Sequence, residues 1–154
     1  MDNFISLTTD ETVMKFVETD AFDIEKAKNL WSKLLEEFYP QGKNTIYAVF
    51  GKNENRYIGH AAIRPRAAKP EDWEISNMLR TLEWDKDFAT EIARGLIEFG
   101  FGDLNLSEVF ATIDDNNFNS IKVAEKAGTS FLRHEFDEEG RFSVYSIKSS
   151  EFQL

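Results

Sequence analysis

The 154-residue chain has no cysteine, three prolines and two histidines. Without cysteine it can hold neither a disulfide nor a thiolate nucleophile. His60 and His134 lie too far apart in the sequence for metal-ligand spacing, so we expect no metal site. No apolar run reaches the length that spans a bilayer, and Met1–Asn3 is not the basic start of a signal peptide. We therefore expect a cytoplasmic protein with no membrane partner.

Positive charge is also scarce. Lysine and arginine number 18 against 28 aspartates and glutamates, which gives a formal net charge of −10. Nucleic-acid-binding domains carry basic faces, so this balance argues against a nucleic-acid partner. It fits a cationic partner such as an amine or a basic peptide, although solubility alone explains such a charge.

What is present indicates one globular domain over residues 1–154. The hydrophobic fraction is 42% and there are 14 phenylalanines, enough for a core. We expect helices over residues 7–16, with a turn near Thr9 or Asp10, and over 24–38, capped by Asp23. The pattern predicts strands over residues 45–50, 56–63, 73–82, 108–113, 131–135 and 141–147, with a loop over 64–72.

The chain is organised around residues 73–131. One apolar helix face follows a 3.6-residue period at Ala89, Ile92, Ala93, Leu96 and Ile97. A second helix is predicted to begin at the cap Asn117 and to end at Gly128.

Three segments of this stretch share a known pattern, in order. They read EISNML at 74–79, WDKDFATE at 84–91 and NFNSIKVAEKAG at 117–128. The segments resemble E-I-G-Y-x-L, W-G-K-G-Y-A-T-E and N-x-x-S-x-[RK]-V-x-E-K-x-G of the GNAT superfamily of acetyl-CoA-dependent N-acetyltransferases. The most similar branch acetylates protein N-termini, ribosomal proteins and small amines.

The resemblance implies an α/β (α+β) fold. Its sheet would be mixed, mostly antiparallel and twisted, with helices on both faces. The family's fourth and fifth strands splay apart to admit acetyl-CoA, and here these strands would be residues 74–82 and 108–113.

The implied activity is transfer of an acetyl group from acetyl-CoA to a primary amine, on a protein N-terminus or a small molecule, by direct attack. Glu74 would take the proton of the amine, Asn117 would bind near the reacting groups, and Ser120 would lie near the thiol. Each residue also has a plain structural explanation: a solvated strand charge, a helix cap and a residue of the first helical turn.

The co-substrate would bind at a helix start, where unpaired backbone amides and the helix dipole attract a pyrophosphate. A backbone amide of the preceding strand would polarise the thioester. Lys122 and Lys126 would reach the adenine end, unless they only form a solvated helix face. The implied acetyl-CoA-binding residues are Asn77, Met78, Leu79, Trp84, Asp85, Lys86, Asp87, Phe88, Ala89, Thr90, Asn117, Lys122 and Lys126.

Two departures from the family pattern leave an alternative open. Asp87 stands at a glycine position of the phosphate loop, and Trp84 replaces the first residue of that loop. We expect the Asp87 carboxylate to cap its helix and to oppose the phosphates by about 1–2 kcal/mol after screening. Such a chain could be a non-catalytic GNAT-fold protein that serves in binding or regulation.

The second departure is at the N-terminus. Phe4–Val17 resembles the end of the family's first helix, so the family's first strand is expected to be absent. An uncovered sheet edge favours pairing with another chain. We therefore predict either a homodimer through that edge or a cover formed by Met1–Leu7.

Overall fold

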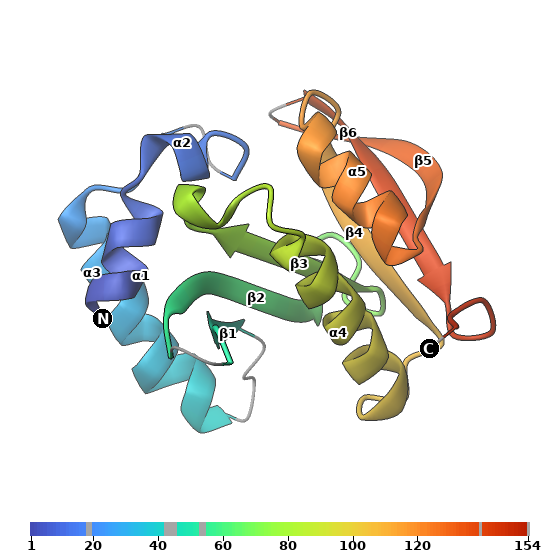
Figure 1. The fold of residues 1–154 in the computed structure, drawn as a ribbon, viewed down its shortest axis with the longest axis horizontal. Helices are drawn as coiled ribbons and strands as arrows, with labels where there is room; N and C mark the ends of the chain where they lie inside the picture. The colour runs from blue at the N-terminus through green and yellow to red at the C-terminus, as the bar shows by residue number, and fades with distance from the viewer. Residues whose placement is uncertain (18–19, 42–45, 53–54, 139, 154) are drawn as a thin grey trace. The chain divides into compact units, whose positions relative to one another are not determined.

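The computed structural model describes residues 1–17, 20–41, 46–52, 55–138 and 140–153. The helices are α1 (Asp2–Thr8), α2 (Glu11–Met14), α3 (Ile24–Lys33), α4 (Phe88–Gly102) and α5 (Phe118–Ala127). The strands are β1 (Ile46–Phe50), β2 (Tyr57–Pro65), β3 (Trp73–Leu79), β4 (Glu108–Asp114), β5 (Ser130–Asp137) and β6 (Gly140–Lys148). Within these described residues the strands form one sheet in the order β1-β2-β3-β4-β6-β5 (Figure 1).

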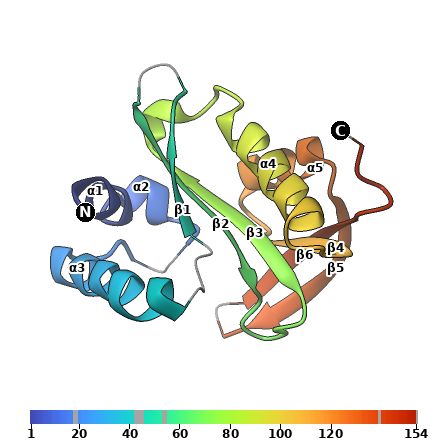
Figure 2. The same cartoon turned by 90° about the horizontal axis from the view of Figure 1, so that it is seen from below.

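The sheet is mixed and mostly antiparallel, and the predicted fold class is confirmed. β3 runs parallel to β4, whereas β6 is antiparallel to both β4 and β5. Helices α4 and α5 pack against each other and against β4 (Figure 2). Val109 and Val144 from the sheet and Ile97 from α4 are fully buried. These three residues belong to the core to which both the sheet and a motif-carrying helix contribute.

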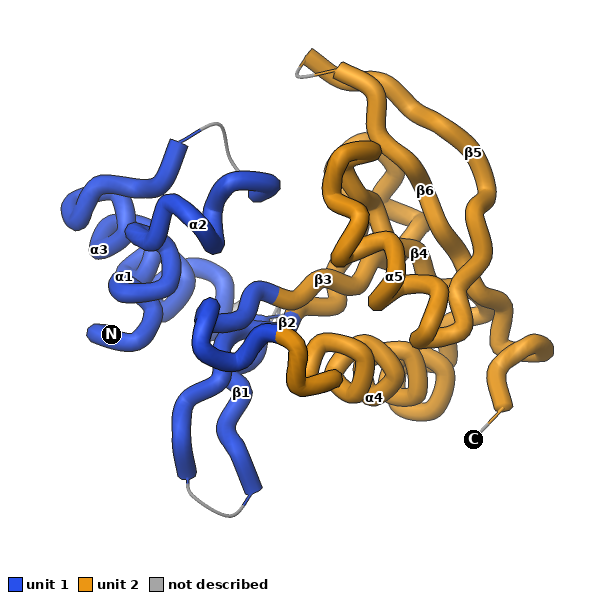
Figure 3. The backbone as a smooth tube through the Cα atoms, turned by 45° about the horizontal axis from the view of Figure 1, so that its top comes forward, with its two compact units in different colours: residues 1–61, 78–84 blue, residues 62–77, 85–154 orange. Residues whose placement is uncertain are grey.

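The chain forms two compact units (Figure 3). Unit 1 contains residues 1–61 and 78–84, and unit 2 contains residues 62–77 and 85–154. In unit 1, the Phe4 ring lies 5.4 Å from Trp31 and 5.1 Å from the His60 ring, centroid to centroid. Unit 2 contains both helices of the motif stretch, and the prediction of a single domain over the whole chain stays a prediction.

The prediction of one helix over residues 7–16 is wrong, because two short helices occupy this region. The Thr9 hydroxyl donates to the Ile5 carbonyl at 2.8 Å at the end of α1. The Asp10 carboxylate then accepts the N–H groups of Thr12 and Val13 and starts α2. Side chains that bond to nearby backbone compete with a continuous helix, so the break falls at the predicted turn.

Other element boundaries also differ from the predictions. The Asp23 cap is confirmed by its bond from the Lys26 N–H at 2.7 Å, but α3 ends at Lys33 and a π-helical turn follows over Leu34–Phe38. The strand predicted over 73–82 ends at Leu79, and a 3-10 turn follows over Thr81–Glu83. Residue 45 of the first predicted strand and residues 53–54 of the hairpin loop lie outside the described residues.

The sheet edge predicted to be uncovered corresponds to β1, at one end of the strand order. Tyr47 and Phe50 on this strand are exposed. Most of Met1–Leu7, the predicted cover, is helix α1, which packs against α3. The homodimer through this edge stays a prediction.

Candidate functional site

The start of α4 has an unusual backbone. Asp85 and Asp87 both adopt left-handed conformations, with φ of 59° and 58°. Aspartate tolerates this region better than most residues, although glycine adopts it most readily. The first helical hydrogen bond runs from the Glu91 N–H to the Asp87 carbonyl at 3.0 Å. The N–H groups of the three residues between them, at 88–90, therefore have no acceptor within the helix.

The predicted cap at Asp87 is wrong. Its side chain makes no capping hydrogen bond, and its Oδ1 instead accepts from Lys126 Nζ of α5 at 3.1 Å. Capping side chains normally belong to residues with extended backbone, and Asp87 is left-handed. Both partners of the ion pair are largely exposed, at 81% for Asp87 and 63% for Lys126. The first-turn amides of α4 are thus left without a cap from this side chain.

The predicted cap at Asn117 is confirmed. Its Oδ1 accepts the Ser120 N–H at 3.1 Å, and α5 ends at Gly128, which has a φ of 106°. Ser120 lies half-buried in the first turn of that helix. The roles of Asn117 and Ser120 toward acetyl-CoA or the amine stay predictions.

The predicted strand residues divide between the two units. In unit 2, Asn77 Nδ2 donates to the Ala89 carbonyl at 3.4 Å and links β3 to the first turn of α4. In unit 1, Met78 packs against the buried Leu7, Val13 and Tyr57. Leu79 is buried, and its carbonyl accepts from the Trp84 indole at 3.0 Å. The side chains of Met78, Leu79 and Trp84 are thereby engaged in unit 1.

The remaining predicted cations lie just before α4 or along α5, with Lys126 in the last turn of α5. Lys86 precedes α4 and is exposed, as is Lys122 on α5. Lys126 is the one that the structure joins to the loop, through its contact with Asp87. Phe88 and Thr90 are half-buried in the first turn of α4.

Glu74 lies where β3 and β4 meet. The register between these strands pairs Glu74 with Phe110 and records no further pair among the described residues. The Thr112 hydroxyl donates to Glu74 Oε2 at 3.0 Å, and Arg64 Nε lies 3.4 Å from Oε1. The limited pairing fits the expected splay of these strands, and the carboxylate at its base has both a donor and a cation beside it.

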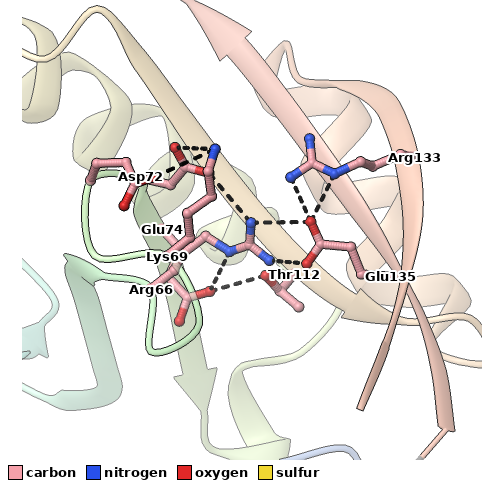
Figure 4. A network of polar contacts seen from close by, with 8 residues as sticks. Arg66, Lys69, Asp72, Glu74, Thr112, Arg133 and Glu135 are labelled. Atoms are coloured by element: carbon pink, nitrogen blue, oxygen red, sulfur yellow. Dashed lines mark hydrogen bonds and ion pairs between the residues drawn. The ribbon is translucent and has the colours of Figure 1, made fainter.

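A polar cluster around Arg66 was not predicted from the sequence (Figure 4). Arg66 is only 4% exposed, and its guanidinium donates to Glu135 Oε2 at 2.6 Å. Asp72 lies 3.6 Å and Glu74 3.9 Å from it. Burial alone would lower the pKa of Arg66, but the hydrogen bond and charge of Glu135, with Glu74 and Asp72, raise it. The cluster thus joins the predicted base to β5.

No local pattern could have revealed this cluster, because Arg66 and Glu135 are 69 residues apart. The Arg66 hydrogen bond also lowers the pKa of Glu135, against the opposite effect of burial. A buried charge that loses its partner is strongly destabilising, so the cluster stabilises unit 2 only as a complete set.

A pocket of about 500 Å³ in unit 2 adjoins this cluster at Asp72 and is also lined by Lys69, Arg133 and Lys148. None of the predicted site residues lines it. No group of residues suited to hold a metal ion occurs in the part of the chain that the structure describes. Across the same residues, no helix combines the length and the apolar character needed to cross a bilayer.

A comparison with known protein families shows to which family the chain belongs. The family described as "Acetyltransferase (GNAT) domain" matches residues 1–130. This chain belongs to the GNAT acetyltransferase family. The motif resemblance at superfamily level is thereby confirmed.

Individual GNAT relatives are distant in sequence. The chain is 29% identical over 122 residues to the uncharacterized N-acetyltransferase YnaD of Bacillus subtilis, covering 79% of this chain and 68% of the relative. It is 26% identical over 116 residues to the uncharacterized N-acetyltransferase p20 of Bacillus licheniformis, covering 75% and 65%. The matches thus span about two thirds of these relatives' length.

Solved GNAT structures share the fold. An acetyltransferase from Bacillus anthracis superimposes with a TM-score of 0.82 at 23% identity, over 97% of this chain and 89% of that one. A spermidine N-acetyltransferase from Vibrio cholerae, in complex with CoA and spermine, gives 0.75 at 15% identity, over 96% and 88%. The aminoglycoside acetyltransferase AAC(6')-Ib, in complex with coenzyme A and kanamycin, gives 0.76 at 14% identity, over 96% and 88%. These structures are consistent with acetyl-CoA as the co-substrate.

Proposed function

We propose that this chain is an N-acetyltransferase that uses acetyl-CoA and a primary amine. The observation that carries the proposal is the start of α4, where the amides at 88–90 precede the first helical hydrogen bond and have no cap from Asp87. A helix start with unpaired amides and a positive dipole end suits a pyrophosphate. The family pattern implies the same location for this group.

The residues around the start of α4 fit the co-substrate, except for the negative charge of Asp87. Asn77 anchors the first turn of α4 to β3, which fixes the direction of its amides. Asp87 brings a negative charge, but Lys126 lies 3.1 Å from its carboxylate and offsets part of that charge. The balance favours binding that is weaker than a glycine at this position would give.

Bound acetyl-CoA supplies the activated acetyl group, which moves from sulfur to the amine nitrogen while the amine gives up a proton. Glu74 is the proposed acceptor of that proton, directly or through water. The Thr112 hydroxyl and Arg64 hold its carboxylate at the point where β3 and β4 part. Glu74→Gln should therefore lower turnover about 10²- to 10⁴-fold while the thermal shift produced by acetyl-CoA is retained.

For the acceptor, we favour a small polycationic amine over a protein N-terminus. The chain carries a net charge of −10, which attracts cations over a distance. Two neighbours of the same fold hold spermine and kanamycin in their crystals, and both molecules carry several amines. Spermidine and kanamycin should accordingly be better acceptors than a neutral peptide with a free N-terminus.

Two measurements test the proposal. Acetyl-CoA at 100 times its Kd should stabilise the fold by about 2.7 kcal/mol in a thermal-shift titration. Release of the CoA thiol can then be followed with a thiol reagent, since the chain contributes no cysteine background. Acceptor-dependent thiol release that Glu74→Gln abolishes would support the enzyme, and binding without release by any amine would contradict it.

The second candidate is a non-catalytic GNAT-fold protein. Asp87, which occupies a glycine position of the family pattern, favours this alternative, because its carboxylate would lie beside the proposed phosphate site. This alternative predicts either no thermal shift or a shift with no turnover for any acceptor.

A further inference from the structure

β5 (Ser130–Asp137) is the last strand in the sheet order and is bonded to β6 on one side (Figure 1). Three large apolar residues on it are exposed: Phe131 at 51%, Leu132 at 44% and Phe136 at 75%. Soluble proteins usually protect a long edge strand with charges, bulges or a covering segment, because such an edge pairs with other chains. β5 does carry charges and a bulge, but Phe131 and Phe136 remain exposed beside an edge that no strand among the described residues pairs.

The register with β6 assigns the side chains of β5 to two faces. Arg133 lies opposite Val144 and Glu135 opposite Phe142, so these two charges share one face. His134 and Phe136, opposite Ser143 and Arg141, share the other face. The register shifts between Phe131 and Arg133, which makes Leu132 the extra residue of a bulge.

We propose that β5 pairs antiparallel with β5 of a second copy of this chain, about a two-fold axis through His134. In this register, Arg133 lies opposite the partner's Glu135. Phe131 lies opposite the partner's Phe136, because the bulge leaves Leu132 without a place of its own in the ladder. Symmetry makes each of these contacts twice. The occupant of the edge is thus the same strand, whose charges and apolar residues complement themselves.

Symmetry and charge together select this register. A two-fold axis that makes two neighbouring strands antiparallel stands perpendicular to the sheet and keeps each face on its own side. Opposite residues must therefore share a face, and the axis must pass through a residue. An axis at Arg133 or at Glu135 would place that charge opposite its own copy, and an axis at Phe136 would oppose Glu135 to Asp137. Like charges directly opposite destabilise a strand pair, whereas opposite charges and apolar pairs stabilise it.

The neighbouring contacts are compatible with this pairing. Arg133 Nε already donates to Glu135 of its own strand at 2.8 Å, and the Arg133 side chain remains 40% exposed. Two such pairs would place four alternating charges across the interface, with each Glu135 also bonded to Arg66 of its own chain at 2.6 Å. The proposed edge lies at the end of the strand order away from β1, the edge predicted from the sequence. The pairing of β5 does not depend on the proposed catalytic function.

Single cysteines test the register directly, since the chain has none of its own. With His134→Cys the two thiols lie opposite each other, and mild oxidation should give a covalent dimer on a non-reducing gel. With Phe136→Cys the thiols lie four residues apart along the strand, about 13 Å, which is too far for a disulfide. Mixing Phe131→Cys with Phe136→Cys chains should restore the cross-link, because Phe131 lies opposite the partner's Phe136.

Sedimentation tests the surface without cysteine. The wild-type protein should sediment as a dimer, and Phe136→Lys should shift it to monomer with an unchanged circular dichroism spectrum. Phe118→Lys is the matched control, since Phe118 is 67% exposed but lies on α5. A monomeric wild-type protein would overturn the proposal. A His134→Cys variant that cross-links no faster than Phe136→Cys would overturn it too, even if the protein were dimeric through another surface.

Discussion

The two helices of unit 2 that carry the family motifs begin in opposite ways. α5 begins at Asn117, whose side chain accepts the Ser120 N–H and closes the helix end. α4 begins at Asp87, a residue with equal capping ability, yet its carboxylate bonds to Lys126. The difference lies in the backbone, because Asp87 has a φ of 58° and Asn117 has −86°. A side chain able to cap is therefore insufficient, and the left-handed start leaves the first-turn amides of α4 without a cap from Asp87.

The largest expected effect comes from Asp87→Gly, which removes the carboxylate and keeps the left-handed backbone. We expect acetyl-CoA to bind about 1–3 kcal/mol more tightly, or about five- to two-hundred-fold. Isothermal calorimetry on both proteins at the same salt concentration measures this difference. The control is Asp87→Asn, which tolerates the same φ and removes only the charge, so it should recover part of the gain.

Two outcomes would contradict the expected gain in affinity for Asp87→Gly. Equal and tight binding by wild type and Asp87→Gly would show that Lys126 already neutralises the carboxylate. No binding by either protein would show that the α4 start is not a phosphate site and would favour the non-catalytic alternative.

A smaller effect is expected at the capped helix. Asn117→Ala should lower the free energy of unfolding by about 1 kcal/mol, because the Ser120 N–H loses its acceptor. Urea denaturation measures the change, and Asn117→Asp, which retains a capping oxygen, should restore most of it. Asp87→Asn should leave stability within about 0.5 kcal/mol, since no cap is lost there. If Asn117→Ala lowers turnover with unchanged stability, the residue acts on the substrates and the capping account is wrong.

The smallest effect is expected at Lys126, which links the last turn of α5 to the start of α4. Lys126→Gln should leave stability almost unchanged, because exposed ion pairs contribute little. It leaves the charge of Asp87 unopposed, so acetyl-CoA should bind about two- to five-fold more weakly at low salt. The difference should shrink as ionic strength rises. Equal affinity at low salt would mean that this ion pair lies away from the bound phosphates.

The comparison also shows how far the sequence leads. The cap at Asn117 was predictable because it depends on residue type and on neighbours within one helical turn. The contact of Asp87 was not, because the sequence does not reveal the sign of its φ. The fold was predictable through motifs at family spacing, whereas the helix break at Thr9–Asp10 depended on competing side-chain bonds.

The Arg66 cluster was the least predictable feature of unit 2. Its contact with Glu135 joins a loop to the sheet edge across 69 residues, with no periodicity to indicate it. Arginine and glutamate are common surface residues, and only the folded structure shows that Arg66 is buried. Charged clusters of this kind come from tertiary structure.

The left-handed backbone at Asp87 has a consequence for how this site can evolve. Aspartate and glycine codons can differ by a single nucleotide, and the chain already has the φ that a glycine would adopt there. A point mutation in the gene could therefore exchange the residue without rebuilding the loop. Selection for tighter or looser use of the co-substrate could then act through one codon, in either direction, on an otherwise unchanged scaffold.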